Sequence, residues 1–112
     1  MSAEAQLEER ICKLLASSPV LLFMKGSPEE PRCGFSRRVV AALTAINQPF
    51  RHFDILTDEA IRAGVKRYSD WPTYPQLFVR DEMIGGCDIV EELAKTGELE
   101  STIRDALAGT AV

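Results

Sequence analysis

The sequence predicts an α/β fold, in which a small mixed sheet of about four strands has helices on both faces. Apolar residues recur at helical spacing in several segments, as at Leu7, Ile11, Leu14 and Leu15. A uniformly apolar run at 20–24 is typical of a strand that is buried on both faces. Helices and short strands alternate along the chain, and a strand-helix-strand order implies a right-handed parallel crossover.

In the first half of the chain, one helix precedes the strand at 20–24 and another follows it. The first helix ends before Pro19, because proline disfavours a helical residue in front of it. A loop at 26–31 leads to the second helix, which ends at Asn47 and Pro49. The apolar stripe of this second helix consists of Val39, Val40, Leu43 and Ile46. The segment 50–55 is the next expected strand.

The middle of the chain contains a third helix and a hairpin. Thr57 is the expected N-cap of this helix, and its apolar stripe consists of Ile61, Val65 and Tyr68. The segment 71–75 (Trp-Pro-Thr-Tyr-Pro) cannot be helical. Residues 77–79 and 83–84 are typical of a hairpin, which adds antiparallel strands to the sheet.

Two helices are expected after Gly85 and Gly86 end the hairpin. Asp88 and Glu91 have the spacing of a capping box for the fourth helix. Gly97 suits the C-terminus of that helix. The last helix is marked by Leu99, Ile103 and Leu107.

Length and composition indicate one globular domain over residues 1–112, either alone or within a longer protein. Apolar residues make up 46% and charged residues 27%, which excludes a disordered or fibrous chain. The net charge of −4 argues against general nucleic-acid binding. The apolar runs are too short to span a membrane. Because no secretory signal is visible, we expect a cytoplasmic protein, with the nucleus, or an organelle entered on a removed transit peptide, left open.

The three cysteines, Cys12, Cys33 and Cys87, are too few and odd in number for a disulfide scaffold. Without a secretory signal they indicate a reducing compartment. No Cys-x-x-Cys pair is present and His52 is the only histidine, so a structural zinc site is not expected. We expect Cys12, next to Ile11 on the first helix, to be a structural residue.

Cys33, in the run Cys-Gly-Phe-Ser, is the expected reactive thiol. It lies between the first strand and the second helix, where unpaired amide N–H groups and the helix dipole stabilise a thiolate. Cations near a thiol lower its pKa, and the surrounding segment carries Lys25, Arg32, Arg37 and Arg38. We therefore predict a partly exposed thiolate rather than a small buried packing residue.

Ser36 stands where a dithiol motif has its second cysteine. Serine cannot resolve a mixed disulfide, so any resolving thiol must come from elsewhere. Cys87 follows Gly86 at another expected helix start. It is either that resolving thiol or a packing residue beside the turn.

The segment 71–75 can present backbone groups to a ligand. A cis bond before Pro75 would turn the N–H and C=O of Tyr74 outward, where an extended peptide can pair with them. The alternative is a rigid loop that only starts a strand. Loops at the carboxyl ends of parallel strands converge in open α/β sheets, although each of the following residues also has an ordinary structural role. The residues that this convergence can bring around Cys33 are Lys25, Arg62, Tyr74 and Asp88.

Four motifs together resemble the monothiol, CGFS-type glutaredoxins in order and spacing. They are Lys25-Gly26-Ser27-Pro28, Cys33-Gly34-Phe35-Ser36, Trp71-Pro72-Thr73-Tyr74-Pro75-Gln76 and Gly85-Gly86-Cys87-Asp88. The similarity runs from about Leu7 to Leu107. The segments 28–31 and 53–56 look closest to the glutaredoxin domains of PICOT-like proteins, and bacterial single-domain members are also similar.

The resemblance implies a thioredoxin-like fold with a cis Pro75 and glutathione bound non-covalently beside Cys33. It also implies a homodimer that shares one [2Fe-2S] cluster. Such a cluster needs four thiolate-type ligands. Cys33 of each chain supplies two of them and two glutathione thiolates supply the others. The lack of a second cysteine in the motif is consistent with this, because no internal disulfide then competes for the ligand.

The resemblance further implies which residues bind glutathione. Lys25 and Arg62 match its glycine carboxylate, and the Tyr74 backbone matches its cysteine residue. The N–H groups of Cys87 and Asp88 suit the γ-glutamyl carboxylate, and the Asp88 side chain suits the ammonium group. Thr73 is either a further contact or a turn former. Phe35 either shields the cluster from water or packs in the ordinary way.

The leading hypothesis is a glutathione-dependent carrier of [2Fe-2S] clusters, with roles in iron–sulfur protein maturation and in iron and redox homeostasis. The expected partners are apo iron–sulfur proteins and BolA-like proteins, with no nucleic acid and no membrane. The alternative is a glutathione-dependent thiol-disulfide oxidoreductase that acts through Cys33. The resemblance implies that such activity is weak. A third hypothesis is an adaptor module of a larger protein.

Overall fold

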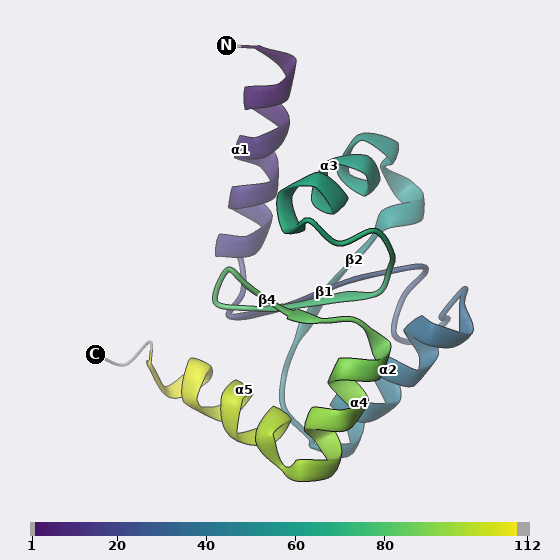
Figure 1. Ribbon diagram of the computed structural model, residues 1–112, viewed down its shortest axis with the longest axis vertical. Helices are drawn as coiled ribbons and strands as arrows, with labels where there is room; N and C mark the ends of the chain where they lie inside the picture. Colours follow the sequence, from purple (N-terminus) through teal and green to yellow (C-terminus); the bar gives the residue numbers. More distant parts are fainter. Residues whose placement is uncertain (1, 110–112) are drawn as a thin grey trace.

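The computed structural model describes residues 2–109 and has the expected α/β architecture (Figure 1). One mixed sheet has the strand order β2-β1-β3-β4. β1 pairs in parallel with β2 and antiparallel with β3, which in turn pairs antiparallel with β4. The strands are β1 (Val20–Met24), β2 (Arg51–Asp54), β3 (Gln76–Val79) and β4 (Glu82–Gly85).

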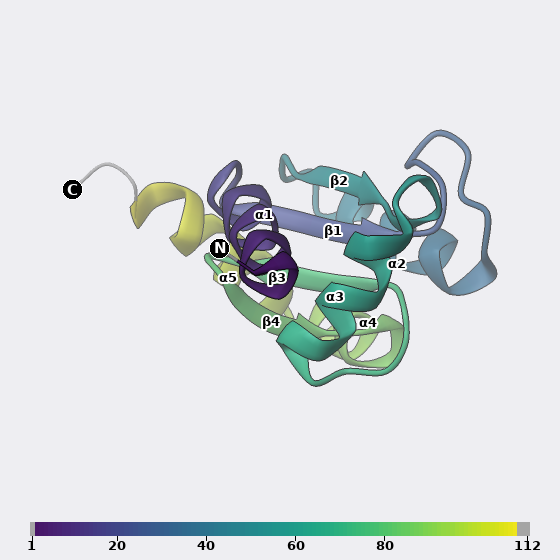
Figure 2. The ribbon, with the colours of Figure 1, turned by 90° about the horizontal axis from the view of Figure 1, so that it is seen from above.

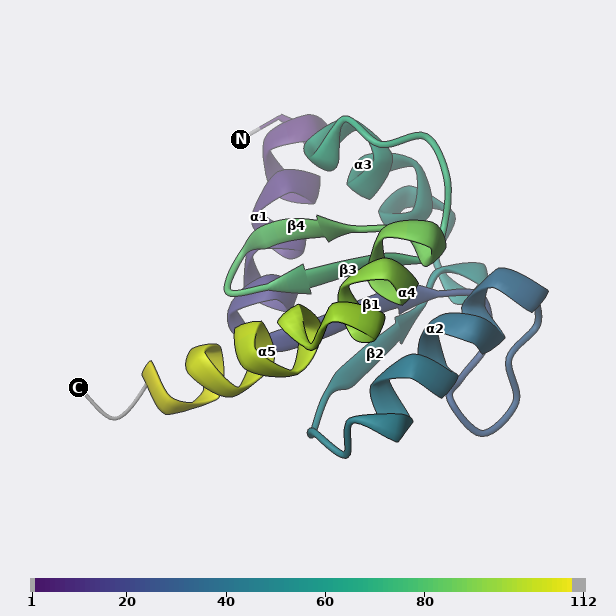
Figure 3. The same cartoon turned by 60° about the horizontal axis from the view of Figure 1, so that its bottom comes forward.

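The helices cover both faces of the sheet. They are α1 (Ala3–Ala16), α2 (Gly34–Ala45), α3 (Glu59–Ser69), α4 (Cys87–Thr96) and α5 (Glu98–Ala108), and a short 3₁₀ turn, η1 (Ile55–Thr57), follows β2. α1 and α3 pack together on one face, whereas α2, α4 and α5 cover the other (Figures 2 and 3). No helix within residues 2–109 is long and apolar enough to cross a bilayer.

β1 is the central element of the core, and all five of its residues are buried. Because successive side chains of a strand point to opposite faces, β1 supplies two separate clusters. Leu22 packs with α2, α4 and α5, and Phe23 packs with α1 and α3. The Phe23 ring meets the Phe78 ring edge to face, with centroids 5.5 Å apart. The predicted burial of this strand on both faces is confirmed.

Two predicted helix caps are wrong. The N-cap of α3 is Asp58, whose carboxylate accepts the Ile61 N–H at 3.0 Å, whereas Thr57 belongs to the preceding 3₁₀ turn. α4 begins after Gly86, which has no side chain to cap with, so Asp88 is already inside the helix. α3 therefore begins one residue later than the Thr57 cap predicts, and α4 begins two residues earlier than a cap at Asp88 predicts.

Two further expectations need correction. β2 covers only residues 51–54 of the expected strand at 50–55, because the backbone turns into η1 at Ile55. Asp54 caps that turn by accepting the Leu56 N–H at 3.0 Å. Cys12 was expected to be structural, but its side chain is exposed, because the buried stripe of α1 runs through Ile11 and Leu15 instead. The expected end of α4 at Gly97 is confirmed, with a left-handed backbone at φ 85°.

Candidate functional site

A cavity of about 590 Å³ lies at one end of the sheet, where β1, α2, α3, the segment 71–75 and α4 meet. It brings together all the residues predicted for the site. These are Lys25, Cys33, Arg62, Thr73, Tyr74, Cys87 and Asp88. The cavity has the size of a small-molecule site, mostly apolar walls and a few charged groups.

Cys33 is the N-cap residue of α2 and has an extended backbone, with φ −157° and ψ 141°. Its thiol is partly exposed. Partial burial by itself raises the pKa of this thiol, but hydrogen bonds from the backbone N–H groups of Ser36 and Phe35 outweigh it, and the Ser36 hydroxyl and the charge of Lys25 add to them. The pKa of Cys33 therefore lies below that of an ordinary thiol, as the helix start predicts.

Ser36 connects the reactive thiol to the central strand. Its side chain is fully buried, and its Oγ accepts the backbone N–H of Lys25 at 3.1 Å. The same hydroxyl is among the groups that lower the pKa of Cys33. Serine in this position thus fixes the end of β1 beside Cys33, a role that the sequence did not suggest.

The neighbouring arginines were expected to lower the pKa of Cys33, but in the structure two of them pair with acidic residues instead. Lys25 is the cation that helps to lower the pKa of Cys33. Arg32 pairs instead with Glu30 at 3.0 Å. Arg38 forms an ion pair with Glu91. The list of four nearby cations therefore overstated their effect on the Cys33 pKa, because acidic partners engage two of the arginines.

The loop between β1 and Cys33 is held by backbone hydrogen bonds. The Arg32 N–H donates to the carbonyl of Lys25 at 2.9 Å, and the Gly26 N–H donates to Asp54 Oδ1 at 2.9 Å. Gly26 has φ +89°, and a Cβ there would lie 2.5 Å from the carbonyl oxygen of Glu30. Only glycine fits this turn, which places Lys25 and Cys33 on the same side of the cavity.

The β1–β3 ladder stops beside Cys33 and leaves a pairing position open. In this register Phe23 faces Gln76, and the next pair to exchange hydrogen bonds would be Lys25 with Tyr74. Lys25 is diverted, because its N–H donates to Ser36 and its carbonyl accepts from Arg32. Across residues 2–109, the backbone N–H and C=O of Tyr74 have no hydrogen-bond partner. An extended peptide can pair there.

Tyr74 also joins the segment 71–75 to α3. Its hydroxyl donates to the carbonyl of Arg62 at 2.6 Å, and burial raises the pKa of this phenol to about 12. The Tyr74–Pro75 peptide bond is cis, as expected. Thr73 is exposed and lines the cavity next to Tyr74.

α3 supplies two cations to the cavity wall, of which only Arg62 was predicted from the sequence. Arg62 and Lys66 are four residues apart and so lie on the same face of the helix. The Lys66 ammonium lies 5.8 Å from the centre of the Tyr74 ring. The spacing from Arg62 was the signal that would have identified Lys66.

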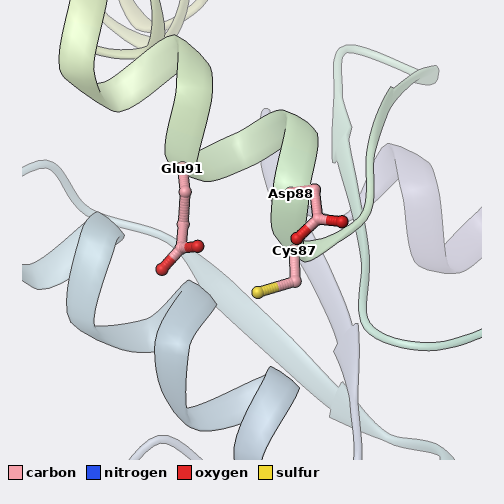
Figure 4. A group of neighbouring side chains, drawn as sticks. All are labelled: Cys87, Asp88 and Glu91. Atoms are coloured by element: carbon pink, nitrogen blue, oxygen red, sulfur yellow. The ribbon is translucent and has the colours of Figure 1, made fainter.

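The start of α4 forms another wall of the cavity. The first N–H groups of a helix have no partner within it, and here the preceding Gly86 provides no side-chain cap. A Cβ at Gly86 would lie 3.4 Å from both Trp71 Nε1 and the Pro75 carbonyl oxygen, so the segment 71–75 packs closely on this turn. Figure 4 shows Cys87 and Asp88 side by side on the first turn. The Asp88 side chain is 94% exposed.

Cys87 differs from Cys33 although both lie at a helix start. Its side chain is 8% exposed and belongs to the core on the α2 face. Burial raises the pKa of the Cys87 thiol, and the carboxylates of Glu91 and Asp88 raise it further, against the charge of Arg38. These properties favour the packing role over that of a resolving nucleophile.

The ligand atoms of Cys87, Asp88 and Glu91 lie within 4.8 Å of one another (Figure 4). Arg38 already provides a cation there, because its guanidinium group pairs with Glu91 and lies 3.9 Å from Asp88. This group is therefore a salt-bridge network between α2 and α4 rather than a good metal site.

Two exposed apolar side chains lie at the rim of the cavity. Phe35 is 56% exposed and Ile89 is 38% exposed. Phe35 follows Cys33 by two residues, and Ile89 follows Cys87 by two. Both apolar side chains therefore stand beside a cysteine at the opening of the same cavity.

Comparison with known proteins gives a consistent result. The glutaredoxin family profile matches residues 20–84. Monothiol glutaredoxin-S17 of Arabidopsis thaliana is 53% identical over 94% of this chain, and glutaredoxin 4 of Escherichia coli is 48% identical over 89%. The chain covers 22% of the length of the Arabidopsis protein and 87% of the E. coli protein.

Solved structures agree with the sequence comparison. The solution structure of reduced apo GrxS14 from poplar is 45% identical and superposes with a TM-score of 0.79, covering 91% of this chain and 94% of that one. A crystal structure of a buckwheat glutaredoxin with glutathione has a TM-score of 0.81 at 23% identity, which shows the shared fold. The chain described here therefore belongs to the glutaredoxin family, among its monothiol members.

Proposed function

We propose that this chain binds glutathione in the cavity beside Cys33, and that two copies share a [2Fe-2S] cluster which they pass to apo iron–sulfur proteins. The observation that carries the proposal is the unpaired Tyr74 backbone, which lines the same cavity as the Cys33 thiol and the two cations of α3. A tripeptide with two carboxylates, one ammonium and one thiol matches this arrangement.

Each part of glutathione has a matching group in the cavity. Its cysteine residue pairs with the Tyr74 backbone as a short added strand. The glycine carboxylate meets Lys25 and Arg62, and the γ-glutamyl carboxylate meets the free N–H groups at the start of α4. The exposed carboxylate of Asp88 accepts from the ammonium group. Thr73 is the remaining contact at the cavity wall.

The cluster is cargo, and the donor set of one chain is suited to half of it. Cys33 is a partly exposed thiol with a lowered pKa, which is the form that binds iron. Ser36 cannot form a disulfide with it. Four thiolate ligands are complete when two chains each contribute Cys33 and one glutathione. Because half of the ligands can diffuse away, the cluster is expected to be transferable.

The apolar rim formed by Phe35 and Ile89 supports a second protein chain in this position. In the homodimer that chain is another copy. We also propose a BolA-like protein as a partner, which replaces one copy in a mixed complex.

Cluster transfer tests this proposal. The protein is reconstituted anaerobically with iron, sulfide and glutathione, freed of unbound iron and sulfide, then mixed with a plant-type apo ferredoxin while glutathione is kept in the buffer. We expect the ferredoxin spectrum to appear while the glutaredoxin loses its colour. A protein that takes up a cluster but never yields it would be a storage or sensing module, which contradicts the carrier role. Cys87→Ala serves as the control, because Cys87 is not a proposed ligand.

The lowered pKa of Cys33 also favours a second candidate, a glutathione-dependent oxidoreductase. The Cys33 thiolate would attack the glutathione sulfur of a glutathionylated protein and release the protein thiolate. A second glutathione thiolate would then attack the Cys33–glutathione disulfide, leaving glutathione disulfide and the Cys33 thiolate. One disulfide is consumed and one is formed, so the electrons balance.

A glutathionylated peptide distinguishes the two candidates. Turnover that rises with glutathione concentration and is lost in Cys33→Ser supports the oxidoreductase. If the mixed disulfide at Cys33 forms but persists with excess glutathione, the second step fails and the carrier remains the main function.

A further inference from the structure

Gln76 is a buried polar residue that lines no part of the cavity, yet it contacts the segment that does. It is the first residue of β3 and its side chain is fully buried. Its Nε2 group donates to the carbonyl of Trp71 at 3.1 Å and to the carbonyl of Thr73 at 3.0 Å. We propose that Gln76 is a positioning residue, which holds the segment 71–75 in the shape that binds glutathione.

The two hydrogen bonds of Gln76 reach both parts of that segment. Trp71 and Thr73 follow the end of α3, where no ladder or helix partner accounts for their carbonyls. Because one amide group holds both carbonyls, the chain between them is bent back toward the start of β3. Tyr74 follows Thr73 directly. The direction of its unpaired backbone N–H and C=O therefore depends on the two Gln76 hydrogen bonds.

Through Trp71, the hydrogen bonds of Gln76 also affect the cavity wall at the start of α4. Trp71 packs against Gly86, where an added Cβ would lie 3.4 Å from Trp71 Nε1 and from the Pro75 carbonyl oxygen. Gly86 is the N-cap of α4, and the first residues of that helix, Cys87 and Asp88, line the cavity. Gln76 therefore fixes the Tyr74 side and the α4 side of the cavity relative to each other.

The chemistry of Gln76 argues against a purely stabilising role. Its Oε1 atom is buried and has no hydrogen-bond partner within residues 2–109. A buried acceptor without a partner is costly. An apolar residue of the same volume would avoid that cost but would leave the Trp71 and Thr73 carbonyls unheld.

This inference rests on the proposed glutathione site, and one set of titrations separates the two. Reduced glutathione is titrated calorimetrically into the wild-type protein and into Gln76→Met, which keeps the volume and removes both donors. We expect the Kd of Gln76→Met to rise about tenfold, as for the loss of one well-formed hydrogen bond. If wild type binds no glutathione, the proposed function fails; if both bind equally, only the role of Gln76 fails.

A matched control distinguishes positioning from general destabilisation. Val79→Ala removes a buried side chain from the other end of the same strand, without touching the segment 71–75. We expect it to lower Tm and leave the Kd unchanged. An equal loss of affinity in Val79→Ala and Gln76→Met would overturn the positioning role. The pH profile of Cys33 alkylation should not move in Gln76→Met, because the groups that lower the Cys33 pKa lie elsewhere.

If Gln76→Met does not fold, Gly86→Val disturbs the same contact from the opposite side and leaves Gln76 intact. A Cβ at Gly86 would lie in ordinary contact with Trp71 Nε1 and the Pro75 carbonyl oxygen, both at 3.4 Å, so the two further methyl groups of valine would press on the segment 71–75. A folded Gly86→Val variant with weakened glutathione binding supports the linkage between the two walls, and one with wild-type affinity contradicts it.

Discussion

The starts of α2 and α4 can be compared directly, because a cysteine lies at each of them and both cysteines line the same cavity: Cys33 is the N-cap of α2, and Cys87 is the first residue of α4. Cys33 is partly exposed and its pKa is lowered by hydrogen bonds and by Lys25. Cys87 is buried and its pKa is raised, first by burial and then by Glu91 and Asp88. A helix start therefore does not by itself make a thiol reactive. Hydrogen bonds to the sulfur, burial and the sign of the neighbouring charges together decide between the two outcomes.

The largest difference between the two thiols should appear in alkylation. In a Cys12→Ser background, iodoacetamide should label Cys33 rapidly near neutral pH and label Cys87 slowly, since only the thiolate reacts. The labelling rate of Cys33 should reach half its maximum at a pH below that of a free thiol, and that of Cys87 at a higher pH.

Single substitutions show which thiol is responsible for the rapid labelling by iodoacetamide. Cys33→Ser should abolish it, whereas Cys87→Ser should leave it unchanged, as measured by mass spectrometry over time. Equal labelling of both thiols in the folded protein would refute the difference between the two helix starts.

Glutathione binding should depend strongly on Arg62, a cation that α3 contributes to the cavity wall. Arg62→Ala should raise the Kd for glutathione about tenfold, because one carboxylate loses a charged partner in the cavity. Arg67→Ala is the matched control, since Arg67 is exposed on the same helix and does not line the cavity. Calorimetry measures both. Equal affinities for the two variants would remove Arg62 from the site.

Ser36→Ala should reduce the lowering of the Cys33 pKa, the property that distinguishes the start of α2 from that of α4. Without the hydroxyl, the pKa of Cys33 rises, so the thiolate fraction near neutral pH falls and alkylation slows about three- to tenfold. The unpaired N–H of Lys25 should cost about 1 kcal/mol of folding free energy. Stopped-flow alkylation and denaturant unfolding measure the two effects.

The control for Ser36→Ala is Ser27→Ala, whose Oγ accepts the Glu30 N–H in the same loop. Ser27 is not among the groups that lower the Cys33 pKa. A pH profile that shifts equally in both variants would show that loop integrity, not the Ser36 hydroxyl, sets the thiol pKa.

The smallest expected effect is at the α4 start. Glu91→Gln removes one of the carboxylates that raise the Cys87 pKa and leaves burial, the larger cause, in place. The pKa of Cys87 should therefore fall slightly but stay above that of Cys33. Alkylation in a Cys12→Ser, Cys33→Ser background measures it, with the exposed Glu92→Gln as the control. No change in Glu91→Gln relative to Glu92→Gln would mean that burial alone sets the Cys87 pKa.

The sequence predicted the elements that depend on local pattern. The continuous apolar run at 20–24 predicts a buried strand, and the helical spacing of Ile61 and Val65 predicts the buried face of a helix. The structure confirms both. The helix caps were predicted less well, because Thr57 and Asp58 are adjacent and both cap helices. Spacing alone does not say which of two neighbouring caps the backbone reaches.

The site residues that could not be predicted act across long sequence distances. The gathering of Arg62, Tyr74 and Asp88 around Cys33 was expected from the family motifs. The diversion of Lys25 from the ladder by Ser36 depends on the folded loop, and no local pattern signals it. Likewise, Arg38 pairs with Glu91 instead of acting on Cys33, and this pairing depends on the packing of α2 on α4.

Native mass spectrometry of the reconstituted protein tests the shared cluster most directly. Wild type and Cys33→Ala are reconstituted anaerobically with iron, sulfide and glutathione and sprayed without denaturation. We expect a wild-type complex of two chains, two glutathiones and one [2Fe-2S] cluster, and only cluster-free chains for Cys33→Ala. A cluster-bearing complex without glutathione, or one retained by Cys33→Ala, would contradict the assignment of Cys33 and glutathione as the four ligands.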